Sequence, residues 1–487
     1  MRLNYLANAI GIMLMYIGLV ILSPVAIALF YHEYESVLPF TSASITAITI
    51  GYFLRKFIKN ANTLENLNDI KKSEALFSVA ACWVIFGLIS AIPYLFYDFT
   101  PVNALFESVS GITTTGATIL THYNYPHALF FWRSFTQWLG GLGIIVLFIA
   151  ILPQFAVAGR QMFFAEAPGP TEDKFTPRIR NTASALWKIY LAFTGLEIGL
   201  LIWAGMPAFD ALCNSLSTLS AGGFSLNEYS IMGYGSSKIT WIVLVFMFLA
   251  GISFNLLYKG LRNPITLFKN EEFRAYFVSV LVMSSLIAGS LFLNHNTNWL
   301  DDIQNALFQV VSITTSSGFA SVDFEKWNYT SKLLLFIVMF MGACASSAGG
   351  GIKLARWIVV FKSMKSEILK ILHPNAIVNI KIDNKTVPTE TARQIIVFIF
   401  FYFLIFGITA ILISILEHNS AVGLTGAISS LGNIGPGVAV TTGPMGNYND
   451  LHILSKLIFT VNMLVGRLEL IPFMVMLQKD FWTFKEN

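Results

Sequence analysis

The sequence predicts an all-α membrane protein with ten transmembrane helices, in which four similar units surround one pore. Three observations predict this fold class. The 487-residue chain is 55% hydrophobic but only 12% charged, whereas a soluble domain carries about 25% charged residues. It contains long apolar segments of the length, roughly 20 residues, that crosses a bilayer as a helix. A short polar motif that ends in glycine also occurs four times along the chain.

The apolar segments predict ten spans, and the first is interpreted as a retained span. Its apolar run is too long for the core of a typical signal peptide, and no small-residue cleavage site follows it. An even number of spans places both termini on one side of the membrane. The predicted spans lie near residues 8–30, 39–57, 75–97, 129–153, 184–205, 239–261, 274–294, 333–360, 393–416 and 455–478.

The polar connections divide into a basic set and an acidic set. Most of the 31 lysines and arginines fall in the basic set, which includes the segments "RKFIKN", "YKGLRNPITLFKNEEFR" and "KSMKSEILK". Because basic loops remain in the cytoplasm, both termini are predicted to be cytoplasmic. The acidic set, with "YDFTPVN", "LDDIQN" and "VDFEKW", then faces outward, where it would concentrate cations at an entrance.

The four copies of the glycine motif occupy equivalent places between spans. Residues 103–116 read "NALFESVSGITTTG" and residues 305–318 read "NALFQVVSITTSSG". A third copy is "DALCNSLSTLSAGG" and a weaker fourth is "VGLTGAISSLGNIG". In every copy a serine lies six residues before the glycine; the serines are Ser110, Ser217, Ser312 and Ser429, and the glycines are Gly116, Gly223, Gly318 and Gly435.

Each copy predicts a unit made of a span, a short helix, a polar loop and a second span. The short helices, about two turns or ~12 Å long, cannot cross the ~30 Å hydrocarbon core. Two additional spans precede the four units. The predicted domains are the N-terminal spans at 1–70 and the pore units at 71–160, 181–262, 270–372 and 390–487.

Four such loops around one axis predict a cation site. Irregular backbone is tolerated inside a membrane only where it is buried in protein or lines water. Backbone carbonyls can replace the hydration shell of a cation, and the negative C-terminal ends of the short helices would favour one there. One such loop alone more often serves helix packing, and a duplicated transporter with ordinary loops remains the alternative. The candidate ligands are Thr114, Thr115, Gly116, Ser220, Ala221, Gly222, Gly223, Thr315, Ser316, Ser317, Gly318, Asn433, Ile434 and Gly435.

A second polar feature lies in the span after the third loop, where residues 342–356 read "GACASSAGGGIKLAR". Three consecutive glycines would break any helix. They indicate either a kink packed against small residues or a flexible loop that obstructs the pore. Arg467 is a charge near mid-span, which costs about 2.5–3.5 kcal/mol on insertion scales. It is therefore expected to face a cavity or to pair with Glu197 or Glu469.

Two other charged residues lie near the first copy of the motif. We expect Glu107, in the short helix, to stabilise the first loop from behind. We expect Arg133, at the start of the following span, to anchor that helix at the outer membrane boundary.

Four units of this kind, with one glycine in each loop, resemble the Trk/Ktr/HKT superfamily of potassium transporters over essentially the whole chain. The two additional N-terminal spans resemble the TrkH/TrkG branch, as do "AEAPGPTEDKFTPRIRNTA", "SAGGFS", "GNIGPG" and "GRLELIP". The resemblance implies potassium uptake across the bacterial inner membrane through a carbonyl-lined selectivity filter. It also implies a homodimer with one pore in each protomer.

The resemblance further implies a gate and a partner. The gate would comprise the intramembrane loop and its neighbours, with Arg467 as a barrier to cations; its residues are Gly349, Gly350, Gly351, Lys353 and Arg467. The partner would be a cytosolic TrkA-type ring that binds nucleotide. This chain has neither a GxGxxG nor a GxxxxGK[ST] phosphate-binding motif, so we expect it to bind K⁺ but no nucleotide.

Other function classes are less consistent with the sequence. The spans contain no metal cluster, acid pair or nucleophile with a base, so the chain is predicted not to be an enzyme, and no nucleic-acid partner is expected. A secondary transporter that couples K⁺ to H⁺ or Na⁺ remains the alternative, with Glu197 and Glu469 as its candidate carboxylates. None of the loops matches the longer TVGYG sequence, so we expect modest discrimination against Na⁺.

Overall fold

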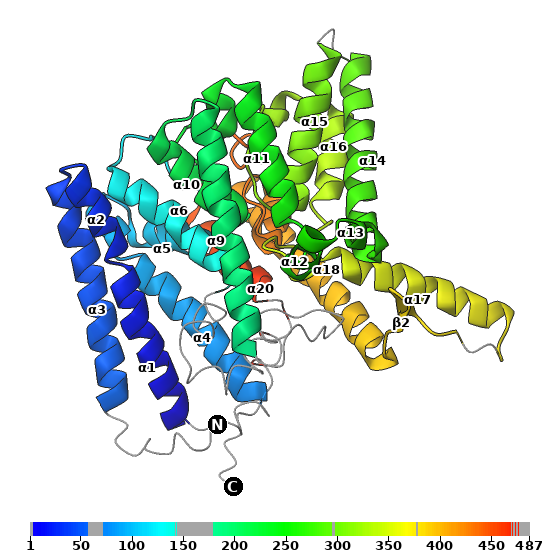
Figure 1. The fold of residues 1–487 in the computed structure, drawn as a ribbon, viewed down its shortest axis with the longest axis horizontal. Helices are drawn as coiled ribbons and strands as arrows, with labels where there is room; N and C mark the ends of the chain where they lie inside the picture. Colours follow the sequence, from blue (N-terminus) through cyan, green and yellow to red (C-terminus); the bar gives the residue numbers. More distant parts are fainter. Residues whose placement is uncertain are drawn as a thin grey trace.

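The described part of the chain is mostly helical in a computed structural model (Figure 1). The predictions for the connection 57–71, for most of the segment 142–178, for Glu469 and for the C-terminal tail lie outside the described residues. The structure describes residues 3–56, 72–141, 179–294, 298–375 and 378–468, together with Gly143, Leu470, Phe473 and Met476.

The N-terminal helices pack against each other at one edge of the molecule (Figure 1). Two of them join into one apolar span, Ala7–Phe30. A β-carbon on Gly51 would lie 2.6 Å from the carbonyl oxygen of Gly11, so the small residues allow the close backbone approach that is typical of membrane helices. These elements are α1 (Leu3–Val20), α2 (Ser23–Phe30), η1 (Tyr34–Ser36) and α3 (Val37–Lys56).

Four short helices carry the glycine motifs, and each ends directly before its loop. Side-chain caps begin three of them: Thr100, Asn298 and Asn419 each accept a hydrogen bond from a backbone N–H of the first turn. The helices have 12, 12, 16 and 13 residues, so they are longer than the predicted two turns but still shorter than a span. They are α5 (Pro101–Ile112), α10 (Ala208–Leu219), α15 (Trp299–Thr314) and α19 (Ser420–Gly432).

Apolar helices of 10 to 29 residues flank these short ones. In sequence order each short helix packs against the helix before it and the helix after it, and α6 also packs on α10, α11 on α15 and α20 on α5. The flanking helices are α4 (Lys72–Ser90), α6 (His127–Gly141), α9 (Ile179–Trp203), α11 (Ser237–Ala250), α14 (Glu271–Asn294), α16 (Tyr329–Val338), α18 (Thr389–Glu417) and α20 (Ile453–Arg467). Short elements between them are η3 (Pro93–Phe96), η4 (Ser230–Tyr234), η5 (Phe324–Lys326), α12 (Phe254–Arg262) and α13 (Ile265–Lys269).

The described residues contain six helices that are long and apolar enough to cross a membrane, or seven if one bent pair counts as a span. The bent pair is α11 and α12, whose axes differ by 106°, so the predicted span 239–261 is not straight. The predicted span 333–360 is not one helix either. The chain leaves the helical conformation between Val338 and Leu354, where the glycine triplet removes side chains that would favour a helix.

A basic helix and a small hairpin project from the body of the molecule (Figure 1). The hairpin turn uses Asp383 and Asn384, which both have positive φ, as a two-residue turn requires. Asp383 accepts a hydrogen bond of 2.7 Å from the backbone N–H of Glu271 at the start of α14. The elements are α17 (Leu354–Leu372) and the antiparallel strands β1 (Lys381–Ile382) and β2 (Lys385–Thr386).

Candidate functional site

The four glycine loops have the same backbone conformation although their side chains differ. The motif glycines all have positive φ, between 75° and 100°. The residue two positions earlier is also left-handed in every loop: φ is 55° at Thr114, 57° at Ala221, 58° at Ser316 and 52° at Asn433. Such angles are strained for a non-glycine residue and persist only where the surrounding structure imposes them. Their recurrence at four aligned positions indicates one shared backbone geometry.

The aligned serines hold this geometry through their backbone carbonyls. In each loop the residue before the glycine donates its N–H to the carbonyl of the serine five residues upstream, at 2.8–2.9 Å. The donors are Thr115, Gly222, Ser317 and Ile434, and the acceptors are Ser110, Ser217, Ser312 and Ser429. The serine spacing that marks the motif therefore corresponds to a hydrogen bond that closes each loop.

The loops contact one another in a closed ring. A β-carbon on Gly435 would lie 2.6 Å from the carbonyl oxygen of Thr115, which no ordinary side chain tolerates. The other three glycines face an equivalent oxygen at even closer range: Gly116 faces the oxygen of Gly222, Gly223 that of Ser317, and Gly318 that of Ile434. We call the four loops 114–116, 221–223, 316–318 and 433–435 the carbonyl ring. Each of the four motif glycines is required by its positive φ and by the neighbouring oxygen.

The first and third loops are supported by their own hydroxyl groups. Thr113 and Thr115 are joined by a hydrogen bond of 2.8 Å between their side-chain oxygens. Thr315 and Ser317 form the equivalent bond at 2.9 Å. These side chains are buried, so the bonds satisfy hydroxyls that would otherwise lose free energy on burial.

The second and fourth loops are supported by amides and a phenol instead. The side-chain amide of Gln137 in α6 donates a hydrogen bond to the carbonyl of Gly222 and accepts one from the backbone N–H of Phe224. Asn433 of the fourth loop donates from its side-chain nitrogen to the Thr115 hydroxyl at 2.9 Å. The hydroxyl of Tyr448 donates to the carbonyl of Gly435 at 3.0 Å. Burial raises the pKa of Tyr448 above its usual range, so this hydroxyl remains protonated and available as a donor.

A buried ion pair lies behind the first loop. The exposed fractions of Arg133 and Glu107 are 2% and 0%, and the guanidinium nitrogen Nη2 lies 2.8 Å from the carboxylate. The carboxylate also accepts hydrogen bonds from Thr118 and from the backbone N–H of Ile119. The prediction for Glu107 agrees with this position. The prediction that Arg133 anchors its helix at the outer boundary is wrong, because the guanidinium is needed inside the protein as the partner of Glu107.

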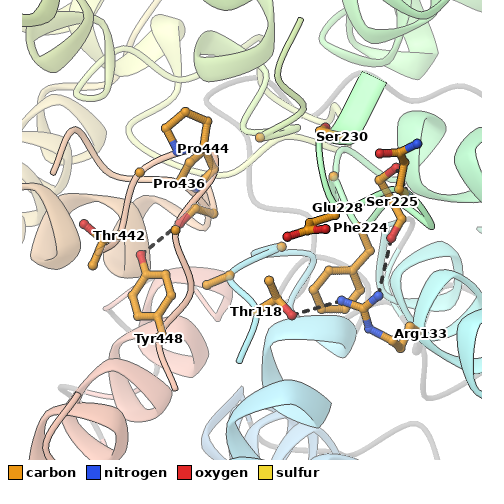
Figure 2. Close-up of a pocket in the computed structure, with 18 of the residues that line it drawn as sticks. Thr118, Arg133, Phe224, Ser225, Glu228, Ser230, Pro436, Thr442, Pro444 and Tyr448 are labelled. Atoms are coloured by element: carbon orange, nitrogen blue, oxygen red, sulfur yellow. Dashed lines mark hydrogen bonds between the residues drawn. The ribbon is translucent and has the colours of Figure 1, made fainter. Parts of the chain in front are cut away.

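A pocket lies directly over the carbonyl ring and is lined by all four motif glycines. Figure 2 shows the Arg133 guanidinium over the Phe224 ring, at 4.1 Å from its centroid. The same view shows the exposed Glu228 carboxylate extending into the pocket. One acidic side chain at the mouth of a ring of carbonyl oxygens would attract cations.

The chain between α16 and α17 packs directly against the ring. The backbone N–H of Gly350 donates to the hydroxyl of Ser316 at 2.6 Å. A β-carbon on Gly349 would lie 2.6 Å from the carbonyl oxygen of Thr315. Gly351 has φ of 71°, and the Lys353 ammonium donates to the carbonyl of Gly349. We call residues 339–353 the inner loop.

Arg467 bonds the inner loop to α6. Its guanidinium donates to the carbonyl of Ala348 at 2.9 Å and to that of Gly141 at 3.1 Å. All five predicted gate residues thus lie in one cluster next to the ring. Of the two carboxylates suggested as partners, Glu469 lies outside the described residues. Glu197 has the Thr218 side chain, not Arg467, as its hydrogen-bonding neighbour in the described part of the chain.

Sequence reasoning missed two side chains that the geometry makes important. Gln137 is a polar residue in the aromatic segment "RSFTQWLGG" and lies four residues after Arg133, so both lie on one face of α6. That spacing was the available signal. Glu272 accepts hydrogen bonds from the backbone N–H groups of Ala345 and Ala355, at 2.6 and 3.1 Å. It joins the inner loop to α14, and its place in a basic connection gave no indication of this.

The described residues contain no group of three or more His, Cys, Asp or Glu that could hold a metal ion. Any cation at the ring would therefore be bound by neutral oxygens. The fold defines the class: a helical protein with several helices long and apolar enough to cross a membrane.

Comparison with known proteins identifies the family within that class. The TrkH family model, described as a cation transport protein, matches residues 44–482, and the chain belongs to this family. It is 34% identical to the Trk system potassium uptake protein TrkH of Salmonella typhimurium over 99% of this chain and all of that protein. It is 30% identical to TrkG of Escherichia coli K12 over 97% of each chain.

A solved structure has the same fold. The crystal structure of the potassium transporter TrkH from Vibrio parahaemolyticus matches with a TM-score of 0.87 and 29% identity, covering 99% of this chain and all of that one. The resemblance to the TrkH/TrkG branch is therefore confirmed. So is the prediction that the chain is not an enzyme, because its relatives are transporters.

Proposed function

We propose that this protein takes up potassium ions across the bacterial inner membrane through the carbonyl ring. The observation that carries the proposal is the closure of the ring, in which each motif glycine lies against a carbonyl oxygen of the next loop. Backbone oxygens at such spacing can replace the hydration shell of K⁺. The four short helices direct their negative C-terminal ends toward the ring, which favours a cation there.

The relatives support potassium as the transported ion, since those named above are potassium uptake proteins. The proposed ligands are the backbone oxygens of the predicted loop residues, including Ser220 and Thr315 at the helix ends. Side-chain hydroxyls support the loops from outside the ring. The ring is one short layer of glycine loops, so we expect K⁺ to be preferred over Na⁺ only modestly.

The test is Gly116→Ser and Gly318→Ser, with uptake of K⁺, Rb⁺ and Na⁺ measured in a potassium-uptake-deficient bacterium and in proteoliposomes. Each substitution combines positive φ with a collision against the neighbouring loop, so K⁺ uptake should fall and the K⁺/Na⁺ ratio should approach one. Gly205→Ser is the matched control, since Gly205 has φ of 97° but no atom near a β-carbon. An unchanged K⁺/Na⁺ uptake ratio in both ring variants would contradict the proposal.

The proposed architecture has ten spans and four pseudo-symmetric pore units. The equivalent backbone of the four loops supports the repeat. Both termini are proposed to be cytoplasmic, on the basis of the basic connections. The proposed boundaries are 1–70 for the N-terminal spans and 71–160, 181–262, 270–372 and 390–487 for the pore units.

The inner loop is proposed to be the gate. Its contacts with Ser316 and Thr315 support an obstruction under the ring, and Arg467 adds a positive charge that repels cations. Deletion of Gly349–Gly351 or Arg467→Ala should raise basal K⁺ uptake. Arg55→Ala, at an exposed position on α3, should leave uptake unchanged. Lower uptake in correctly inserted gate variants would contradict a gating role.

A TrkA-type cytosolic ring is the proposed regulatory partner, and a homodimer is the proposed assembly. The projecting α17 and its hairpin offer a surface through which such a partner would move the inner loop. Uptake at low K⁺ with and without a TrkA-type protein tests this dependence. Equal K⁺ uptake with and without the TrkA-type protein would contradict a regulatory role for such a partner.

A coupled secondary transporter is the second candidate, and Glu197 is the observation that favours it. This carboxyl group is fully buried, with the Thr218 side chain as its hydrogen-bonding neighbour among the described residues, and a buried carboxyl group inside a membrane commonly marks an ion or proton pathway. Glu197→Gln keeps the shape and removes the ionisable group. Loss of the pH dependence of uptake with K⁺ passage intact would favour coupling, whereas an unchanged pH profile would exclude Glu197 from it.

A further inference from the structure

The second loop of the carbonyl ring lacks the hydroxyl groups that support its neighbours. Where the first and third loops have Thr115 and Ser317 before the glycine, the second loop has Gly222. The hydroxyl of Ser220 therefore has no loop hydroxyl to pair with. Like Thr113 and Thr315, it donates to carbonyls of its own helix, at Leu216 and Ser217. The second loop nevertheless has the same backbone angles as the others.

The hydroxyl of the motif serine is also unused in this copy. Ser110, Ser312 and Ser429 each donate to a carbonyl at or just beyond the motif glycine, at 2.6–2.7 Å. The side-chain hydroxyl of Ser217, in contrast, has no hydrogen-bond partner among the described residues. Two supports that stabilise the first and third loops are thus missing from the second.

Gln137 of α6 replaces both supports. Its side-chain nitrogen Nε2 donates to the carbonyl of Gly222 at 2.7 Å, and its oxygen Oε1 accepts from the backbone N–H of Phe224 at 3.1 Å. The Gln137 amide group is therefore bonded to the residue before Gly223 and to the residue after it. Gln137 is fully buried, so its bonds are not weakened by competing water.

Gly222 and Gln137 fit each other by size. A β-carbon on Gly222 would collide with the amide group of Gln137, and all three of its nearest neighbours belong to that amide. Gly222 has no positive φ to require glycine. The absence of a side chain at this position is therefore explained by the space that Gln137 occupies.

The acceptor that Gln137 bonds is itself one of the four ring oxygens. Gly222 O is the oxygen that Gly116 faces. Within the described residues, no N–H or O–H group donates to the equivalent oxygens of Thr115, Ser317 and Ile434. A carbonyl oxygen has two lone pairs, so Gly222 O can accept from Gln137 and still bind a cation. Its position and its electron density then depend on a side chain from the neighbouring unit.

We infer that Gln137 is a positioning residue that determines the ion selectivity of the second quarter of the ring. It fixes the position of Gly222 O, whereas the first and third loops are supported by hydroxyl groups of their own. This inference rests on the proposed function of the ring as a selectivity filter. It adds a residue from outside the four motifs, and it makes the ring chemically asymmetric.

The test compares Gln137→Met with Gln309→Met in the full-length protein reconstituted in proteoliposomes, with K⁺ and Na⁺ uptake measured separately. Methionine preserves the size of glutamine and removes both bonds. Loss of one hydrogen bond to a ring oxygen predicts a fall of about five- to tenfold in the K⁺/Na⁺ uptake ratio. Gln309 is equally buried but donates to Ser321 rather than to the ring, so its variant should retain the ratio.

A pair of compensating substitutions tests the same inference if the Gln137→Met variant inserts poorly into the membrane. Gly222→Ser alone should reduce uptake, because the new side chain meets the Gln137 amide. Combining Gly222→Ser with Gln137→Ala makes room, and it gives the second loop the hydroxyl spacing of Thr315 and Ser317. The double variant should recover most of the selectivity that Gln137→Ala alone loses.

Two outcomes would overturn the inference: an unchanged uptake ratio in Gln137→Met, or no recovery in the double variant. If the ratio changes in Gly116→Ser and not in Gln137→Met, the ring remains the filter and only the role of Gln137 fails. If neither changes it, the proposed function fails as well.

Discussion

The first and third loops of the carbonyl ring differ from the second and fourth in the origin of their support. The first and third are braced by pairs of hydroxyls within the loop, Thr113 with Thr115 and Thr315 with Ser317. The second and fourth rely on amide groups, Gln137 from α6 and Asn433 within the loop. All four reach the same backbone angles.

This difference teaches that the backbone, and not the side-chain sequence, is the repeated feature. A loop of this geometry can lack its own hydroxyls if a donor from elsewhere replaces them, because a buried polar group needs a hydrogen-bond partner but not a particular one. The cost is that the second and fourth loops depend on contacts that a local sequence motif does not contain.

The largest expected effect is at the ion pair behind the first loop. Glu107→Ala removes the partner of buried Arg133 and leaves an uncompensated charge, which costs about 3–5 kcal/mol. Thermal unfolding of the detergent-solubilised protein and the yield of inserted protein should both fall sharply. Gln309→Ala changes the equivalent, uncharged position of the third copy, so its loss should be only about 1–2 kcal/mol. Equal losses of stability in the two variants would show that the ion pair stabilises the protein no more than the uncharged glutamine does.

A smaller effect is expected where the fourth loop meets the first. Asn433→Gly keeps the left-handed conformation but removes the bonds from the side-chain nitrogen to the Thr115 hydroxyl and the Met463 carbonyl, both at 2.9 Å. Losing them should cost about 1–3 kcal/mol and weaken K⁺ selectivity. Thermal unfolding and the K⁺/Na⁺ uptake ratio measure the two effects.

Asn384→Gly is the control for Asn433→Gly. Asn384 also has positive φ, at 63°, but it lies in the exposed hairpin turn. This variant should change neither stability nor selectivity. If both glycine variants behave alike, the side-chain bonds of Asn433 are not what holds the fourth loop.

The sequence was sufficient for the features that repeat. The four glycines and the serines six residues before them could be aligned without a structure, and each serine proves to close its loop through a backbone hydrogen bond. The glycine triplet likewise predicted a break in its span, because no side-chain context can make three glycines a stable helix interior.

The sequence was insufficient for the contacts between units. Arg133 reads as a boundary residue because periodicity does not reveal a carboxylate 26 positions upstream in the chain. Gln137 is, from the sequence, only a polar residue in an aromatic segment, since its partners Gly222 and Phe224 lie 85 and 87 residues further along the chain. Such contacts depend on how the helices are arranged around the ring, and spacing within one segment carries no information about that arrangement.

The smallest expected effect separates the motif serines from one another. Ser110→Ala removes a hydroxyl that donates to the Ala117 carbonyl at 2.6 Å, which should lower stability by about 1 kcal/mol. Ser217→Ala removes a buried hydroxyl with no partner among the described residues, so its stability should be unchanged or slightly higher, because an unsatisfied polar group is lost. Thermal unfolding of the two variants side by side measures the difference. A cost at Ser217 equal to that at Ser110 would mean that the second loop is braced like the first, and the contrast between the loops would then fail.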